Sequence, residues 1–341
     1  MTKNITITGY GVVARELIQL IDQSKDNLLK KYGVEFKVSA IGSSQGMITA
    51  TEGIDLAMLL KFGTGSSALK QYAKATQQSL LPTRMIGDVL VECSPTNTET
   101  GGAGLVYFNE AMDAQMDIVS VAKGALVHSF KEIQQKAKDN KVRIKYSGAT
   151  AAALPTLDIG EFSLAGTTIT KIEGVLNGTS NYILSAMDES QLSFTEALKI
   201  AQENGIAESN PKLDVAGFDS AAKILLLTNG LLEKDFSIQD VEITGIENIS
   251  KTDIELAKQA GKTIKLLAQA VVEKDEVRME VKPCAIELTH PLAHIHGTNK
   301  GIVFETIEMG TICTTGGASH PRGAAAAALK DLINLYRKDM L

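Results

Sequence analysis

Ile5-Thr6-Ile7-Thr8-Gly9-Tyr10-Gly11-Val12-Val13-Ala14 is the stretch that decides the fold of this 341-residue chain. Its β-branched start predicts a strand, and the apolar spacing after it predicts a helix. The G-x-G-x-x-A pattern between them suits a dinucleotide: Gly9 permits a tight turn, Gly11 admits a pyrophosphate, and Ala14 lets strand and helix pack closely. We therefore expect a cofactor site at Gly9, Gly11, Val12 and Val13, at a helix N-terminus that attracts phosphate. An ordinary strand-to-helix turn, which also favours glycine, is the alternative.

Strand-like and helical segments alternate through the rest of the first half of the chain. We expect strands at 36–41, 89–93, 117–121 and 142–144, and helices at 12–22, 68–77, 103–114 and 130–140. Strands joined by crossover helices form a parallel sheet with helices on both faces. The expected fold is thus α/β at the N-terminus, with a Rossmann-type parallel sheet.

The pattern changes near Ser147, where an α+β region begins. We expect helices at 193–204, 215–232 and 323–338, and strands at 168–175, 265–272, 277–283, 301–305 and 311–314 that form an antiparallel sheet. The expected division is a Rossmann domain at 1–147, completed by a C-terminal helix within 318–341, and a second domain at 148–317.

Composition excludes several classes of protein. The net charge of −6 offers no basic face for nucleic acid. Neither a leader-like segment nor an apolar run of membrane-spanning length is seen. The three cysteines are odd in number and far apart, as in a reducing compartment. We expect a cytoplasmic protein without nucleic-acid or membrane partners, and no metal site at the histidines His290, His294 and His296.

The ends of the predicted strands carry the remaining cofactor candidates. No Asp or Glu ends the second strand, where an acidic residue would bind a free ribose 2′-hydroxyl. Ser43, Ser44 and Lys61 suit a 2′-phosphate instead, so NADP is favoured while NAD stays open. Ligands bind outside the carboxyl ends of parallel strands, which places Ser94, Pro95 and Lys123 on the functional edge. An ordinary surface role is the alternative for Lys123.

The densest chemistry lies between residues 207 and 223. Asp219 and Lys223 are four residues apart, on one face of an apolar helix. A surface ion pair is the plain alternative. With Glu208 and Asp214 nearby, the carboxylates and the lysine suit a small zwitterionic substrate. Upstream, Asn177 and Thr179 offer donors for a substrate carboxylate or simply cap a helix. The two roles are compatible.

The sequence resembles the homoserine dehydrogenase family over nearly its whole length. The resemblance runs through GYGVVA (9–14), AKGALV (122–127), GATAAALP (148–155), GVLNGTSNYIL (174–184), ALKIAQENGIAESNPKLDVAGFDSAAK (197–223), HPLAHIHGTNKGIV (290–303) and GGASHPRGAAAAALKDL (316–332). The 174–184 and 197–223 blocks are the specific ones.

The resemblance implies an NAD(P)-dependent enzyme of threonine and methionine biosynthesis that interconverts aspartate 4-semialdehyde and homoserine. It implies that Lys223 is the acid–base residue, that Lys123 assists it, and that Asp219, Glu208 and Asp214 bind the amino group of the substrate. The segment from Gly316 through Gly317 and Ala318 would return with the last helix to cover the cofactor. The second domain would catalyse the reaction and form a homodimer. We also expect no C-terminal regulatory domain of the kind that longer members carry.

Three positions depart from the family pattern: Ala122 replaces Asn, Asn210 replaces Asp, and Ser147 replaces a glutamate that helps to bind a monovalent cation. The charged ligand of that ion is therefore missing, and backbone carbonyls around Thr150 and Ala152 are the remaining ligands.

Two rival interpretations use the same fold. The first is another two-domain NAD(P)-dependent oxidoreductase, such as an aldehyde-acylating semialdehyde dehydrogenase, whose chemistry needs a Cys nucleophile with a His base. Cys93, the cysteine nearest the expected crevice, lies in a strand without a designated His. A non-catalytic cofactor sensor would be expected to lose its lysines, yet Lys123 and Lys223 are present.

Overall fold

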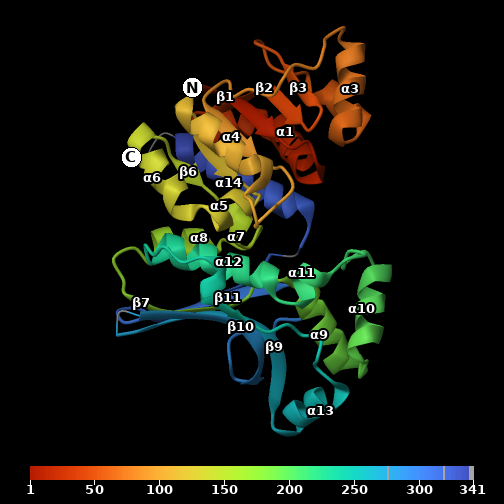
Figure 1. The fold of residues 1–341 in the computed structure, drawn as a ribbon, viewed down its shortest axis with the longest axis vertical. Coiled ribbons are helices and arrows are strands. Elements are labelled where there is room, and N and C mark those ends of the chain that lie inside the picture. Colours follow the sequence, from red (N-terminus) through yellow and green to blue (C-terminus); the bar gives the residue numbers. More distant parts are fainter. Residues whose placement is uncertain (275, 318, 338–341) are drawn as a thin grey trace. The chain divides into compact units, whose positions relative to one another are not determined.

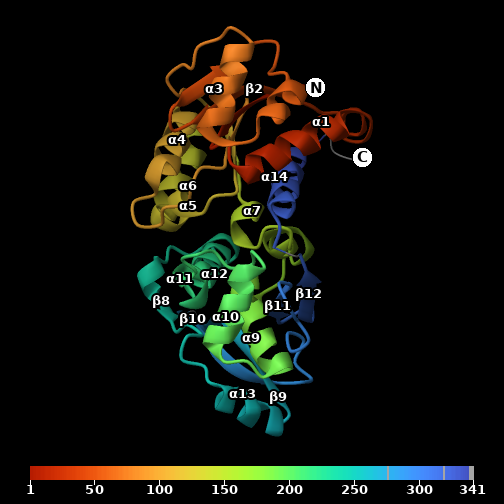
Figure 2. The ribbon, with the colours of Figure 1, turned by 90° about the vertical axis from the view of Figure 1, so that its right-hand side faces the viewer.

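The computed structural model of the protein describes residues 1–274, 276–317 and 319–337. The chain forms two compact units, and Figures 1 and 2 show their elements. Unit 1 comprises Met1–Ala152 and His320–Leu341, and unit 2 comprises Ala153–Ser319. Ala318 and the end of the expected last helix, from Lys338 onward, lie outside the described residues.

Unit 1 is built on a six-stranded sheet with the order β3-β2-β1-β4-β5-β6. The expected parallel sheet is confirmed, since neighbouring strands from β2 to β6 pair in parallel. The edge strand β3 is antiparallel to β2 and was not predicted. The strands are β1 (Thr2–Thr8), β2 (Glu35–Ser43), β3 (Gly46–Thr49), β4 (Val89–Glu92), β5 (Asp117–Ser120) and β6 (Ile144–Lys145).

The helices of unit 1 connect and cover these strands. The first helix was predicted to end at residue 22 but continues to Tyr32, where Gly33 caps it in the left-handed conformation with φ 68°. The helices are α1 (Val12–Tyr32), α2 (Leu56–Leu59), α3 (Gly65–Ala75), α4 (Gly102–Asp113), α5 (Gly124–His128), α6 (Phe130–Asn140), α7 (Ser147–Thr150) and α14 (Pro321–Tyr336), with a 3-10 turn at Leu60–Phe62.

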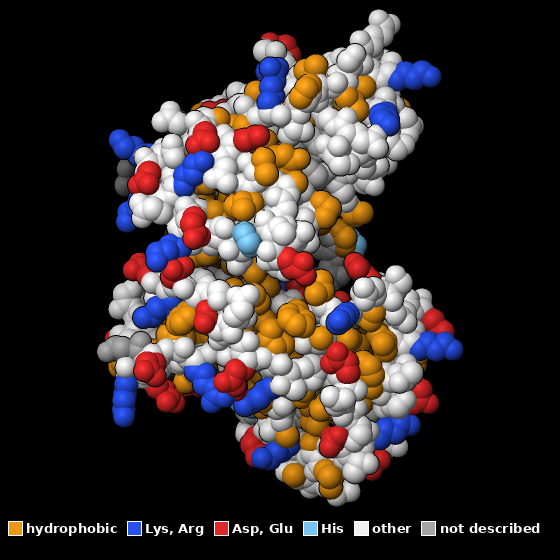
Figure 3. Space-filling model, viewed as in Figure 1, with side chains coloured by type: hydrophobic (Ala, Val, Ile, Leu, Met, Phe, Trp, Pro, Cys, Tyr) orange, Lys and Arg blue, Asp and Glu red, His pale blue; other side chains and the backbone are white. Residues whose placement is uncertain are grey.

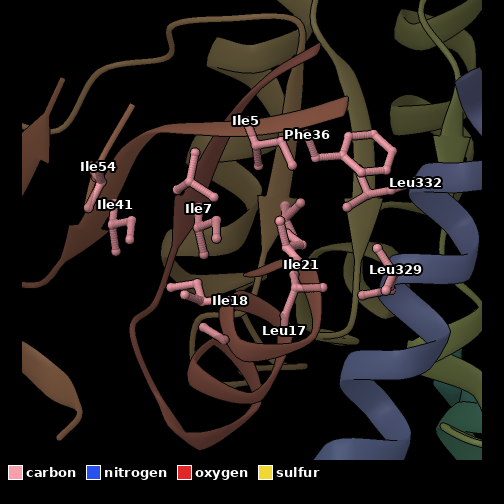
Figure 4. Close-up of a cluster of buried hydrophobic side chains, with 14 of the residues drawn as sticks. Ile5, Ile7, Leu17, Ile18, Ile21, Phe36, Ile41, Ile54, Leu329 and Leu332 are labelled. Carbon is pink, nitrogen blue, oxygen red and sulfur yellow. The ribbon is translucent and has the colours of Figure 1, made fainter. Parts of the chain in front are cut away.

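The core of unit 1 explains why the C-terminal helix belongs to it. Figure 4 shows Ile5 and Ile7 of β1 facing side chains of α1, with Leu329 and Leu332 of α14 in the same cluster. Leu332 is fully buried, and burial of a leucine contributes roughly 1.5–3 kcal/mol to folding. Helix α14 is therefore held by apolar packing against the N-terminal half of the chain.

The boundary between the units differs from the expected one. Residues 148–152 were assigned to the second domain, but they belong to unit 1. The reason is the start of α7, where the Ser147 backbone N–H and hydroxyl donate to the buried Asp331 carboxylate of α14 at 2.9 and 2.8 Å. These bonds hold α7 in unit 1.

Unit 2 contains a second six-stranded sheet with the order β12-β11-β7-β9-β10-β8. Its pairs are antiparallel as predicted, except for β8, which pairs in parallel with β10. The strands are β7 (Ile169–Val175), β8 (Val241–Ile243), β9 (Lys262–Glu273), β10 (Glu276–Glu287), β11 (Lys300–Thr306) and β12 (Gly310–Gly316).

One expected helix of unit 2 starts later than predicted. The segment predicted as a helix over 215–232 becomes helical at Phe218, after Gly217, whose φ of 86° is left-handed. The helices are α8 (Thr156–Asp158), α9 (Gly178–Ser190), α10 (Phe194–Glu203), α11 (Lys212–Val215), α12 (Phe218–Leu231) and α13 (Lys251–Gln259), with a π-helical turn at Ile159–Ser163 and a 3-10 turn at Ile238–Asp240.

Figure 3 shows acidic and basic side chains interspersed on the displayed face. Among the described residues, none of the helices has both the length and the apolar character needed to cross a bilayer.

Candidate active site

The glycine turn after β1 has the geometry that the motif requires. Gly9 has a φ of 82°, and a Cβ atom there would lie 2.5 Å from the Cys93 carbonyl and the Ser94 nitrogen. Its own N–H donates to the Gly42 carbonyl at 3.0 Å. Gly9 thus lies where the ends of β1, β2 and β4 meet, and no other residue fits.

Gly11 faces open space at the start of α1. It is the N-cap residue, with extended backbone angles, and no protein atom lies within 4 Å of a Cβ built on it. Val12 is exposed, while Val13 packs against the core. Because the first N–H groups of a helix lack partners within it, this open N-terminus fits the phosphates of a dinucleotide.

The three residues expected to select the cofactor lie on two segments. Ser43 ends β2 and Ser44 lies in the turn to β3, and the Ser43 hydroxyl donates to the Gly46 carbonyl at 3.2 Å. Lys61 is exposed on the following 3-10 turn. Their contact with a 2′-phosphate stays a prediction.

The other edge residues follow β4 and β5. The Ser94 backbone N–H donates to the Glu92 carboxylate at 2.8 Å, and its hydroxyl donates to the same oxygen. Pro95 is exposed. Lys123 is the N-cap residue of α5, and its N–H donates to the Thr96 hydroxyl at 3.4 Å. The buried Glu92 was not singled out from the sequence.

The expected lysine–carboxylate pair is present in unit 2. The Lys223 ammonium lies 2.6 Å from Asp219 Oδ2 and donates to the Leu176 carbonyl at 2.8 Å. The side chains are 12% and 15% exposed, so this is not the freely solvated pair of the plain alternative. Helix α12 fixes the spacing, since residues four apart share one face.

Asn177 links this pair to a second carboxylate. Its side-chain N–H groups donate to Asp214 at 2.7 Å and to Asp219 at 2.8 Å. Its side-chain oxygen accepts the Ser180 N–H at 2.8 Å and so caps α9. Asn177 therefore holds Asp214 and Asp219 together and anchors both to the helix start.

The charge around Asp214 prepares the cluster for a cation. Burial raises the pKa of the Asp214 carboxyl, and the neighbouring Asp219 charge raises it further. The exposed Glu208 adds to this effect. Thr179 binds the loop that carries Glu208, since its hydroxyl donates to the Ile206 carbonyl at 3.2 Å. A ligand ammonium would relieve the repulsion between these carboxylates.

Lys300, at the start of β11, is a further residue of this cluster that was missed. It is 3% exposed, and its ammonium donates to the Gly317 carbonyl at 2.8 Å. Burial, followed by the positive charge of Lys223, lowers the pKa of Lys300 to about 8. Gly317 has a φ of 67°, and a Cβ there would lie 2.7 Å from the Leu154 nitrogen. The sequence signal that could have pointed to Lys300 was a lysine as the first residue of an apolar strand.

The Ser147 region does not fit a monovalent cation through the Ser147 side chain. The Ser147 hydroxyl donates to Asp331, and it accepts from the Lys330 ammonium at 2.9 Å. A positive charge already lies there and would repel a second one.

The described residues also lack any group of three or more His, Cys, Asp or Glu side chains that could hold a metal ion. Two of the histidines pair with carboxylates instead: His290 with Glu173 at 2.8 Å, and His296 with Glu189 at 2.9 Å.

Comparison with known proteins agrees with these features. The sequence model of a family described as homoserine dehydrogenase matches residues 155–333. A homoserine dehydrogenase from Methanocaldococcus jannaschii is 34% identical over 98% of this chain and 98% of its own length. An NAD(+)-dependent homoserine dehydrogenase from Pseudomonas canavaninivorans is 29% identical over 98% of this chain and 96% of its own length.

Solved structures show the same similarity. A protein from Archaeoglobus fulgidus, provisionally named a homoserine dehydrogenase, is 31% identical with a TM-score of 0.86, over 98% of this chain and 99% of that one. A homoserine dehydrogenase from Thermoplasma acidophilum has a TM-score of 0.81 over 98% of this chain and 99% of that one, and at 21% identity it shows the shared fold.

Proposed function

The chain belongs to the homoserine dehydrogenase family, and from this premise we propose that it catalyses the NAD(P)-dependent interconversion of L-homoserine and L-aspartate 4-semialdehyde. The observation that carries the proposal is the Lys223–Asp219–Asn177–Asp214 cluster, in which an ammonium and two carboxylates are held by a helix cap. The cluster combines a group that moves a proton with groups that recognise an amine.

Lys223 moves the proton at the hydroxyl oxygen of the substrate. In the oxidation of homoserine, neutral Lys223 takes the hydroxyl proton, and in reduction the ammonium returns it to the carbonyl oxygen. A positive charge beside the developing alkoxide also stabilises it. Asp219 and the Leu176 carbonyl hold the lysine in place. When bound, the nicotinamide cofactor supplies the hydride chemistry.

The carboxylates recognise the substrate amine. Asn177 holds Asp214 and Asp219 together, the charges of Asp219 and Glu208 both raise the pKa of Asp214, and a bound ammonium would lower it. Asn177 orients both aspartates, and the backbone N–H groups of the α9 start, near Thr179, suit the carboxylate of the same substrate.

The cofactor is held mainly by unit 1. Gly9, Gly11, Val12 and Val13 would bind its phosphates, and the absence of an acidic residue at the end of β2 favours NADP. Ser43, Ser44 and Lys61 are the candidate 2′-phosphate ligands. Because the Pseudomonas relative is named as NAD(+)-dependent, both cofactors belong in the assay.

The remaining cofactor contacts come from Ser94, Pro95, Lys123 and Gly317. Lys123 would assist the proton transfer as well as contact the cofactor. The family resemblance further supports a homodimer that acts in the cytoplasm, in threonine and methionine biosynthesis.

The direct test is oxidation of L-homoserine by the purified protein, followed at 340 nm with NADP and with NAD in turn. L-Serine, one methylene shorter, is the matched control substrate. The expected result is reduction of cofactor with homoserine and a lower kcat/KM with serine. A protein that oxidises homoserine with neither cofactor contradicts the proposed activity.

A further inference from the structure

Glu92 is a buried acid at the functional edge of the unit 1 sheet that the proposed reaction does not use. It ends β4 and is 1% exposed. One carboxylate oxygen accepts the Ser94 N–H and hydroxyl, and the other lies 3.5 Å from the Ser120 hydroxyl at the end of β5. A buried carboxyl is costly to keep charged, so its position calls for a reason.

The packing around Glu92 leaves little room for rearrangement. On the α4 side, a Cβ atom on Gly104 would lie 3.4 Å from the carboxylate. The titratable group next to it is the Cys93 thiol, whose pKa is raised by burial and then by the Glu92 charge. Lys123 follows Ser120 by three residues on the loop after β5. Glu92 thus joins the loop after β4 to the end of β5.

Sheet topology indicates which half of a dinucleotide lies above these segments. The strand order reverses between β1 and β4, where a dinucleotide crosses the edge of the sheet. The adenosine ribose lies at the end of β2 in this fold. The nicotinamide half therefore falls to the β4 and β5 side, where Glu92, Ser94 and Ser120 are found.

We propose that the Glu92 carboxylate selects the redox state of the cofactor, because its negative charge favours the oxidised, positively charged nicotinamide over the reduced, neutral ring. The inference rests on the proposed function, since it assumes a nicotinamide cofactor in unit 1. Burial, opposed in part by the Ser94 bonds, raises the pKa of Glu92 to about 7. The preference for the oxidised form therefore strengthens as the pH rises through neutrality.

Linkage makes the effect measurable without turnover. If ionised Glu92 favours the oxidised cofactor, binding of that cofactor must favour ionised Glu92. Near pH 7, binding of the oxidised form therefore releases more protons than binding of the reduced form. The 2′-phosphate is common to NADP and NADPH, so its own titration cancels in the comparison.

The test measures the dissociation constants of NADP and NADPH by calorimetry at pH 6 and pH 8, in wild type, Glu92→Gln and Asp88→Asn. Asp88 precedes the opposite end of β4, so Asp88→Asn removes a carboxylate far from the functional edge. In wild type and Asp88→Asn, the ratio of the NADPH constant to the NADP constant should rise about tenfold with pH, the size of a partly screened charge–charge interaction. In Glu92→Gln the ratio should stay flat.

Two results overturn the inference: a wild-type ratio that does not change with pH, or an unchanged slope in Glu92→Gln. If Glu92→Gln does not fold, proton release by wild type decides, and equal release with NADP and NADPH overturns the inference. Wild type that binds none of the nicotinamide cofactors overturns the proposed function itself, a separate outcome from loss of redox selectivity.

Discussion

Gly11→Ala separates the needs of the fold from the needs of the cofactor. The Gly11 backbone is extended, with φ −88° and ψ −168°, a region open to alanine. A Cβ atom there meets no protein atom within 4 Å. Exchange of glycine for alanine at an N-cap or in a permitted extended conformation changes stability by less than about 1 kcal/mol in either direction. The variant should fold normally.

Cofactor binding should respond differently, because the open space is where the pyrophosphate approaches. A methyl group there moves the phosphate away from the N–H groups at the start of α1. Loss of one hydrogen bond to a charged group costs about 1.5–3 kcal/mol, which corresponds to a dissociation constant roughly tenfold to hundredfold larger. The predicted signature is a large binding loss without a stability loss.

Calorimetric titration with NADP, together with urea unfolding followed by circular dichroism, measures both quantities on the same sample. Gly9→Ala provides the contrast, since its Cβ would lie 2.5 Å from the Cys93 and Ser94 backbone and should destabilise the fold. If Gly11→Ala binds the cofactor within twofold of wild type, the phosphate does not lie at this turn.

Three further predictions concern a buried acid, a buried lysine and the core of unit 1. Burial raises the pKa of Glu92 to about 7, against 4.5 ordinarily, so the protonated acid stabilises the fold and this stability is lost as the pH rises between those values, by ~3 kcal/mol at most. Glu92→Gln should therefore unfold at a higher urea concentration than wild type at pH 8. An equal unfolding midpoint would refute this. Lys300→Met frees the Gly317 carbonyl and should raise the cofactor KM about tenfold. The control Lys265→Met removes a buried lysine bonded to the Ile295 carbonyl, and it should lower stability but leave the cofactor KM unchanged. Equal KM values in the two variants would contradict a role of Lys300 in cofactor binding. Leu332→Ala should lower the free energy of unfolding by roughly 2–5 kcal/mol, measured by urea unfolding, and a loss below 1 kcal/mol would show that α14 contributes little to the core.

The sequence was most informative where one local pattern determines the structure. Alternating strands and helices predicted the parallel sheet of unit 1, and the i,i+4 spacing predicted the contact between Asp219 and Lys223. These features depend on neighbours along one element. The strand β3 was missed because it follows β2 through a tight turn, without a helix between them.

Features that depend on tertiary packing could not be read in the same way. Lys300 meets Gly317 across the start of a hairpin, and Glu92 meets Ser120 from 28 residues away. Lys300 lies in the family-like block 290–303, but the block does not show what its ammonium contacts, and burial of each charge arises only when separate elements pack together. The late start of the helix expected over 215–232 likewise depends on a single left-handed residue, Gly217, which a helix period does not reveal.

The most direct measurement compares turnover of L-homoserine by Lys223→Ala and by Lys212→Ala, which removes an exposed lysine from the neighbouring helix α11. The Lys223 variant should lose about a thousandfold in kcat, the scale of general acid–base catalysis, while NADP binds within twofold of wild type. The Lys212 variant should turn over normally. Full turnover by Lys223→Ala would show that another group moves the proton.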